Sequence, residues 1–180
     1  ESIINLLKSN NPDLRIFAAD ILGFADSSLP VFPLCEALLK DPEVNVRYQA
    51  AVSLGKLGKP EAADCLYQAL EEDEEWVKFA VIEALIRIRD ESSLDVLAKA
   101  LDNVSELVGA MIVDALSEMG SVKYVPLLLK KLDSSSTALR NKIIKALLNL
   151  LGGKSLTLLS RSEREKFNEY LLAALEDNEE

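Results

Sequence analysis

Residues 41–60 read DPEVNVRYQAAVSLGKLGKP, and the rest of the chain repeats this pattern with variations. An Asp-Pro pair is typical of a helix start, and Gly58 followed by Pro60 is typical of a helix end. Between them, apolar residues recur at spacings that place them on one helix face: Val46, Ala50, Ala51, Leu54 and Leu57. A helix this short cannot bury its own apolar stripe, so it must pack against other copies of itself.

The same arrangement occurs five times along the chain. In each copy, a Leu near the end of one helix is followed seven residues later by the Val or Leu that opens the next. The openings are offset by 32, 31, 31 and 31 residues, at Leu14, Val46, Val77, Val108 and Leu139. Regular self-similarity of this length predicts an all-α fold of stacked two-helix repeats, at about residues 1–25, 26–58, 59–89, 90–120 and 121–151.

After Leu151 the repeat pattern ends and a different helix is predicted. Ser162 and Glu165 have the spacing of a capping box, which indicates a last helix running to Leu175. Its apolar face is expected to contain Phe167, Tyr170, Leu171, Ala174 and Leu175. We predict that residues 152–180 are a C-terminal capping helix that covers the last repeat, followed by an acidic tail.

Composition and charge limit the possible classes of function. With 49% hydrophobic residues the chain can build a core, and with 6% aromatic residues this core is aliphatic. The net charge of −10 repels phosphate backbones and anionic membranes. The sequence contains no membrane-length apolar run and no leader, so we expect a soluble, cytoplasmic protein. It starts at Glu1 already in a helical pattern, which is compatible with a longer parent chain.

Residues capable of catalysis or metal binding are scarce. The sequence contains no His, which removes the commonest general base and metal ligand. Cys35 and Cys65 lie on helical patterns and are expected to be buried free thiols, rather than a disulfide or a metal pair. The acidic run of residues 71–75 is interpreted as a charged turn because it lacks the ligand spacing of a calcium loop. We therefore expect no catalytic residues, no metal and no cofactor.

The pattern resembles that of a known repeat family. The quoted stretch contains Val46-Arg47-x-x-Ala50-Ala51-x-x-Leu54-Gly55, and the first copy contains Leu14-Arg15-x-x-Ala18-Ala19-x-x-Leu22-Gly23. Both resemble the HEAT-like repeats of phycobilisome lyases. The resemblance covers about residues 1–151 and implies a right-handed α-solenoid, an alpha-alpha superhelix, with the second helices lining its concave side. Such repeats serve many unrelated partners, so the resemblance indicates the fold more than the function.

A basic residue follows the helix opening in four copies, at Arg15, Arg47, Lys78 and Arg140. This could be a ladder for binding phosphates, but carboxylates on the same helices would cancel its field. We interpret the four cations as structural. Each is expected to bind a carboxylate or the C-terminal carbonyls of an adjacent copy.

Positions outside the apolar stripe carry aromatic residues in the first three copies. The predicted binding ridge on the concave face consists of Tyr48, Val52, Trp76, Phe79, Glu83 and Met111. Exposed aromatic residues grouped on one surface are typical of protein-binding hot spots. In the alternative interpretation, aromatic side chains such as Phe17, Phe24 and Phe79 fill gaps between helices or contact preceding repeats.

We therefore predict a non-enzymatic scaffold that binds a peptide or protein surface, with no nucleic acid and no membrane as partner. One alternative is an accessory subunit of an enzyme, such as a phycobilin-lyase-like protein that handles a chromophore. A second alternative is a nucleic-acid-binding module, which the net charge of −10 disfavours.

Overall fold

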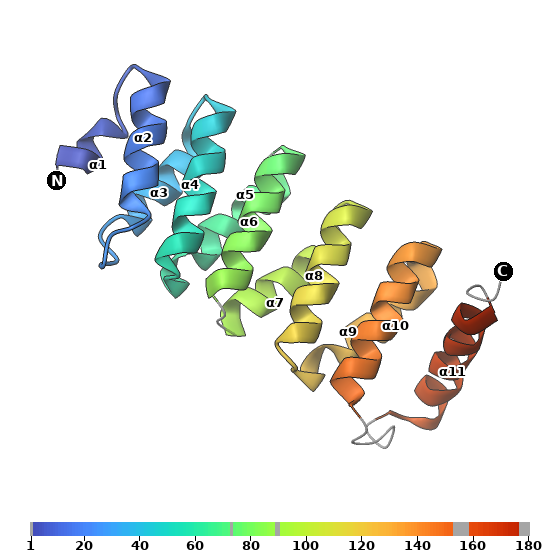
Figure 1. Ribbon diagram of the computed structural model, residues 1–180. Coiled ribbons are helices and arrows are strands. Elements are labelled where there is room, and N and C mark those ends of the chain that lie inside the picture. Colours follow the sequence, from blue (N-terminus) through green and yellow to red (C-terminus); the bar gives the residue numbers. More distant parts are fainter. Residues whose placement is uncertain (1, 73, 89–90, 153–158, 177–180) are drawn as a thin grey trace. The chain divides into compact units, whose positions relative to one another are not determined.

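The computed structural model describes residues 2–72, 74–88, 91–152 and 159–176, which are helical or lie in turns and loops. They form two compact units, Glu1–Val108 and Gly109–Glu180. The described part of the chain contains no strand, and its helices come in consecutive pairs. The predicted all-α solenoid class is confirmed (Figure 1).

The first unit is a row of helix pairs. In Figure 1 the second helices of its pairs, α2, α4 and α6, run side by side, and α1, α3, α5 and α7 lie behind them. Helix α8, Glu106–Glu118, crosses the boundary between the units. The bounds are α1 Ser2–Leu6, α2 Pro12–Leu22, α3 Val31–Lys40, α4 Val44–Leu57, η1 Pro60–Ala62 (a 3₁₀ turn), α5 Ala63–Glu72, α6 Glu75–Ile88 and α7 Glu91–Ala100.

The predicted apolar stripe is the core of this unit. Its residues in α4 are buried, including Val46, Ala50 and Leu54. The glycine that follows the stripe leucine lets the next helix approach. A Cβ added at Gly23 would lie 2.9 Å from the Cβ of Ser53, and one added at Gly55 would lie 2.8 Å from the Cα of Ala84. The Leu-Gly pair of the repeat is therefore a packing requirement between neighbouring second helices.

Helix α4 begins two residues later than the Asp-Pro signal suggests. Its first residue is Val44, because Asp41 instead ends α3 in an extended conformation. The carboxylate of Asp41 accepts the backbone N–H of Glu43 at 3.0 Å and also binds Arg15. The Asp41 side chain therefore serves both the chain entry to α4 and the contact with Arg15.

The expectation of free thiols is wrong. Cys35 of α3 and Cys65 of α5 form a disulfide, with their Cα atoms 5.7 Å apart. Helices α3 and α5 are the first helices of consecutive pairs and lie against each other. The two cysteines are 30 residues apart, one residue short of the 31-residue repeat, so the stacking places them opposite each other. The disulfide thus joins the second pair to the third.

The second unit ends in the predicted last helix. It contains η2 Val122–Tyr124, α9 Val125–Lys131, η3 Leu132–Ser134, α10 Thr137–Leu151 and α11 Arg161–Glu176. Helix α11 packs on α10 and buries Phe167. Of the predicted apolar face of α11, Leu175 is exposed. These contacts support the proposal that α11 caps the last repeat. The acidic tail beyond Glu176 lies outside the described residues.

The capping box of α11 lies two residues earlier than predicted. The backbone N–H of Ser160 donates to Oε2 of Glu163 at 2.8 Å, and the N–H of Glu163 donates to Oγ of Ser160 at 3.3 Å. The hydrogen bonds of Ser160, through its hydroxyl and its backbone N–H, lower the pKa of Glu163. The sequence offers two Ser-x-x-Glu pairs for the capping box, Ser160 with Glu163 and Ser162 with Glu165. The structure uses the first pair, so the prediction of Ser162 with Glu165 is wrong.

None of the described helices combines the length and the apolar character that a membrane crossing requires.

Candidate functional site

Two exposed aromatic rings meet on the second helices of the first unit. The rings of Tyr48 from α4 and Trp76 from α6 have centroids 5.1 Å apart and planes inclined by 34°. Each residue is 38% exposed, although both lie close to fully buried core positions. Tyr48 is two residues after Val46, and Trp76 is one residue before Val77. The core residues fix the two helix ends, and the helices hold the rings together at the surface.

The other predicted ridge residues are placed less favourably for contact with a partner. Val52 follows Tyr48 by one helical turn and is half-buried. On α6, Phe79 is half-buried and Glu83 is exposed. Met111 is half-buried and belongs to the second unit. The structure therefore brings Tyr48 and Trp76 together and leaves Val52 and Phe79 partly accessible on the same two helices.

The surroundings of the aromatic pair are acidic. Glu74 and Glu75 directly precede Trp76 and are exposed, and Glu75 accepts a hydrogen bond from the Ser105 hydroxyl. The pair supplies apolar ring faces together with a phenol hydroxyl and an indole N–H. Such a surface suits an apolar anchor with basic flanking groups.

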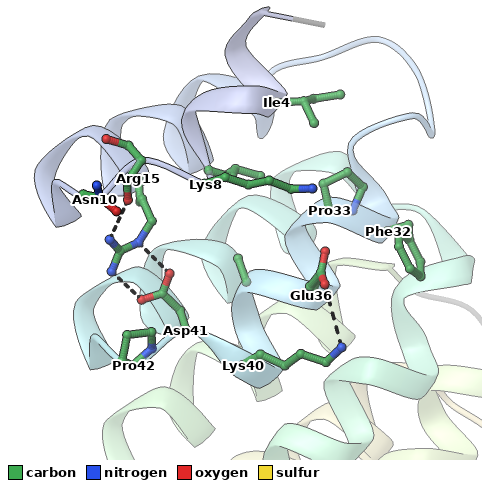
Figure 2. Close-up of a pocket in the computed structure, with 13 residues that line it drawn as sticks. Ile4, Lys8, Asn10, Arg15, Phe32, Pro33, Glu36, Lys40, Asp41 and Pro42 are labelled. Atoms are coloured by element: carbon green, nitrogen blue, oxygen red, sulfur yellow. Dashed lines mark hydrogen bonds and ion pairs between the residues drawn. The ribbon is translucent and has the colours of Figure 1, made fainter.

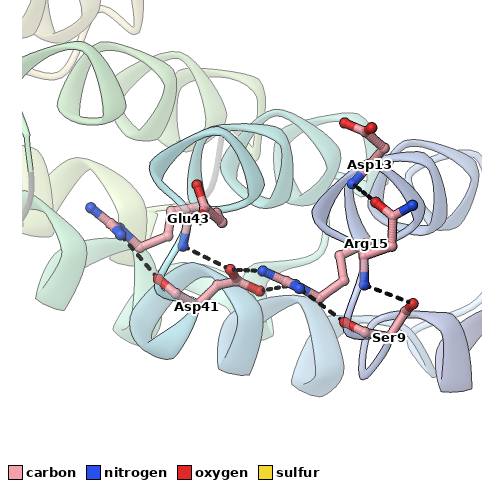
Figure 3. Close-up of polar contacts among 7 residues, drawn as sticks. Ser9, Asp13, Arg15, Asp41 and Glu43 are labelled. Carbon is pink, nitrogen blue, oxygen red and sulfur yellow. Dashed lines mark hydrogen bonds and ion pairs between the residues drawn. The ribbon is translucent and has the colours of Figure 1, made fainter.

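Three of the four cations that follow a helix opening bind groups within the fold, and Arg15 reaches a carboxylate of the adjacent copy, as predicted. Figure 3 shows Arg15 of α2 directed at Asp41 at the end of α3. Its Nε and Nη2 atoms lie 2.7 and 2.8 Å from the two carboxylate oxygens, and its Nη1 atom donates to the Ser9 carbonyl at 2.9 Å. Both side chains are buried. The Asp41 hydrogen bond raises the pKa of Arg15, and the contact ties the first helix pair to the second.

The equivalent cations bind carbonyl groups at the end of the first helix in their own pair. Arg47 donates to the Asp41 carbonyl at 3.0 Å. Arg140 donates to the carbonyls of Leu132 and Ser135, at 3.3 and 3.0 Å. These cations already have partners in the fold, which argues against a ladder for binding phosphates.

A cleft of ≈ 590 Å³ lies between α1 and α3 (Figure 2). Arg15 and Asp41 face each other at one side of it, and Phe32 lies at the other. Lys40 at its rim is 3.7 Å from Glu36. Two pairs of the charged groups drawn there, Arg15 with Asp41 and Lys40 with Glu36, are thus engaged with each other. A second cleft, of ≈ 470 Å³, borders the disulfide and is lined by Phe32, Leu39 and both cysteines.

The described residues contain no group of three or more His, Cys, Asp or Glu side chains that could hold a metal ion. The sequence interpretation missed two features of the surface. One is the disulfide, which the spacing of 30 residues could have revealed. The other is the exposure of Leu14 and Ile21 on α2, which the repeat pattern assigns to the buried stripe.

Comparisons with known proteins place this architecture in context. The family model for HEAT repeats matches residues 1–86, 29–108 and 66–148. Among solved structures, the complex of CpcE and CpcF of phycocyanin lyase from Nostoc sp. PCC7120 matches with a TM-score of 0.64 and 25% identity. The match covers 86% of this chain and 65% of that chain.

Human deoxyhypusine hydroxylase in complex with glycerol matches with a TM-score of 0.44 and 17% identity, over 97% of this chain and 83% of that one. A TM-score this low does not support a functional comparison between the two proteins. No curated protein matches the sequence.

Proposed function

Because the chain belongs to the HEAT-repeat family, as its resemblance to phycobilisome-lyase repeats predicted, we propose that it is a non-enzymatic scaffold that binds a protein or peptide segment. The segment is held against the second-helix face of the first unit. Tyr48 and Trp76 are its anchors, with Val52, Phe79 and Glu83 beside them. The observation that carries the proposal is the contact of two exposed rings at 5.1 Å on neighbouring helices.

The chemistry of the surface defines the partner. Aromatic rings that are ordered before binding lose little conformational freedom when a partner covers them. The acidic groups at Glu74, Glu75 and Glu83 attract basic side chains. The expected ligand is therefore a segment with one or two large apolar residues flanked by Lys or Arg.

Selection from a displayed peptide library tests this function. Trp76 is the only tryptophan, so binding at the pair must change the fluorescence of this one residue. Peptides selected on the natural chain should shift this emission and bind Tyr48→Ala at least about tenfold more weakly. Phe32→Ala serves as the matched control, because Phe32 is an exposed aromatic residue on a first helix. If Phe32→Ala, but not Tyr48→Ala, weakens the selected peptides, the pair is not the binding site.

A triple substitution separates binding from folding. Ala at Tyr48, Trp76 and Phe79 should abolish peptide binding while the circular dichroism spectrum and the melting curve stay nearly unchanged. Loss of the folded signal in this variant would instead assign the three rings to the core and contradict the proposal.

A second candidate is an accessory role in an enzyme that handles a chromophore. The similarity to the phycocyanin lyase complex favours it, although the chain spans only 65% of the matched lyase chain. In this case the chain would act together with a second protein. Incubation with a bilin should then shift the visible absorption band, and an unchanged spectrum would eliminate this candidate.

A further inference from the structure

The Cys35–Cys65 disulfide lies at the wall of a cleft and not in the core. Leu34 and Leu66, the sequence neighbours of the two cysteines, are fully buried. Cys35 is half-buried and Cys65 is 7% exposed. Both border the cleft of ≈ 470 Å³ that residues of α3 and α5 line. This volume is in the range of clefts that take small molecules, so a small reagent can reach the bond while the unit stays folded.

The rim of this cleft is acidic. The exposed side chains of Glu36, Glu61 and Asp64 line it, and Lys40 is the one cation among its described lining residues. Nζ of Lys40 is 3.7 Å from the Glu36 carboxylate, so these two charges offset each other. Glu61 and Asp64 then leave the cleft with an excess of negative charge. A cationic or neutral molecule is therefore favoured there over an anionic one.

Small thiols are the molecules that react with such a bond. The reacting species is the thiolate, which attacks one sulfur and expels the other. Because Cys35 is the more exposed of the two residues, an incoming thiolate reaches its Sγ first. A bond forms between the thiol sulfur and Sγ of Cys35, and the bond between Cys35 and Cys65 breaks. Sγ of Cys65 leaves with the electron pair and takes a proton from water.

Packing keeps the released cysteine within reach of its former partner. Helices α3 and α5 lie against each other, and the Cα atoms of the two cysteines are 5.7 Å apart. Disulfides form between cysteines at this separation. Once it is deprotonated, Cys65 can therefore attack Sγ of Cys35 in the mixed disulfide, expel the small thiolate and restore the original bond.

We propose that Cys35 is a thiol-exchange site, at which a small cationic or neutral thiol enters the cleft and forms a mixed disulfide. Cys65 is the resolving cysteine. While the mixed disulfide persists, the covalent link between the second and third helix pairs is open. The acidic rim selects the reagent, because a thiol that carries an ammonium group is attracted and one that carries a carboxylate is repelled.

The rate of disulfide opening by thiols of different charge tests this selection. Cysteamine, mercaptoethanol and mercaptoacetate are compared on the natural chain. Each rate is expressed per thiolate and divided by the rate of the same thiol on hydroxyethyl disulfide, so that intrinsic nucleophilicity cancels. At low salt, cysteamine should react at least about fivefold faster than mercaptoacetate. High salt should reduce this ratio, because it screens the carboxylates of the rim.

Paired charge variants assign the selection to the cleft. Glu61→Gln with Asp64→Asn should lower the ratio of the two rates. Glu118→Gln with Glu169→Gln is the matched control, because it removes the same charge from exposed residues that do not line the cleft. The control should keep the ratio of the natural chain. Circular dichroism verifies that both variants are folded.

Peptide mass analysis identifies the sulfur that is attacked. After an acid quench and alkylation of the freed thiol, the small thiol should be on Cys35 and the alkyl group on Cys65. In Cys65→Ser, a cysteamine adduct loaded on Cys35 from cystamine should persist once the free reagent is removed. In the natural chain the adduct should be lost as the disulfide re-forms.

Four results would overturn the proposal. They are two free thiols in the chain isolated without reductant, an adduct on Cys65 instead of Cys35, equal normalised rates for the three thiols, and a rate that does not depend on thiol concentration. The last result would mean that the unit must unfold before the bond reacts. Peptide binding at Tyr48 and Trp76 is measured separately, so failure here leaves the proposed function intact.

Discussion

The first and the last second helices of this sequence, α2 and α10, are covered to different extents. Phe17 on α2 is 56% exposed, and Phe24 just after α2 is 71% exposed with the Lys56 ammonium over its ring, whereas α11 packs on α10 and buries Phe167 to 1% exposure. The same kind of side chain is therefore surface at one end and core at the other. The difference shows that the repeat pattern alone does not cover both sides of every second helix, because a second helix inside the array packs between two neighbours.

The α2 end is instead held by links between helix pairs. The buried ion pair of Arg15 with Asp41 joins the first pair to the second, and the Cys35–Cys65 disulfide joins the second to the third. The α11 end relies on burial of Phe167 and on contacts with Asp133, which accepts hydrogen bonds from Lys166 and Tyr170. These two kinds of support predict different responses to mutation, reduction and pH.

The largest contrast is expected from truncating a phenylalanine at each end. Phe167→Ala should destabilise the second unit by about 4 kcal/mol, because it removes a buried ring and leaves a cavity. Phe17→Ala should change stability by less than about 0.5 kcal/mol, because that ring lies in solvent. Urea unfolding measures both. Similar losses for the two variants would mean that the two rings are not covered to different extents.

Reduction of the disulfide should affect only the first unit. Cys35 and Cys65 close a loop of 30 residues, for which the chain-entropy relation gives a stabilisation of about 3.5 kcal/mol. Hydrogen exchange should therefore accelerate in α3 to α5 after addition of a reductant and stay unchanged in α9 to α11. The double variant Cys35→Ser, Cys65→Ser serves as control and should not respond to reductant. Unchanged exchange in the natural chain would argue that the bond does not support this unit.

Breaking the buried ion pair should loosen α2. Asp41→Ala leaves the guanidinium of Arg15 buried without its carboxylate, which should cost about 3 kcal/mol. Asp20→Ala is the matched control, because it removes a half-exposed partner of Lys56 and should cost less than about 1 kcal/mol. Thermal unfolding compares the two variants. A larger loss for Asp20→Ala would contradict the structural role assigned to Arg15.

The smallest expected effect is a pH dependence confined to the α11 end. The Lys166 and Tyr170 hydrogen bonds lower the pKa of Asp133 from its ordinary value of 3.8, and Ser160 lowers that of Glu163 from 4.5. The undocked state then binds more protons in this range, so docking is fully stabilised above these ordinary values and is lost as the pH falls below about 4. Amide exchange of α11 measures this loss, while α2 serves as the internal reference.

The same contact has an alkaline limit. The hydrogen bond to Asp133 raises the pKa of Tyr170 above its ordinary value of 10.0. A raised pKa means that docking favours the protonated phenol, so this contribution is complete below pH 10 and is lost above it. Tyr170→Phe should remove the alkaline step and keep most of the packing. An alkaline step that persists in Tyr170→Phe would assign it to another group.

Much of the fold could be predicted from the sequence, and individual residues show which contacts could not. Arg15 was correctly interpreted as structural, because a cation at a fixed repeat position has the same neighbours in each copy. Tyr48 and Trp76 are placed on one predicted ridge because both flank a helix opening, and their ring centroids lie 5.1 Å apart. Asp41 was misplaced as a helix start because its bond to Arg15 joins residues 26 positions apart, which local signals do not contain. The disulfide was missed because its spacing matters only once the stacking is known.

The sequence alone determined the paired helices, the 31-residue repeat and the buried stripe, because these follow from helical periodicity within single segments. Tertiary structure decided which cysteines meet, which serine caps α11 and which apolar side chains remain in solvent. Each of these depends on which neighbour lies across a helix surface. Phe17 of α2 and Gln49 of α4 occupy the same repeat position, yet Gln49 reaches Asp20 of the neighbouring helix whereas Phe17 is 56% exposed.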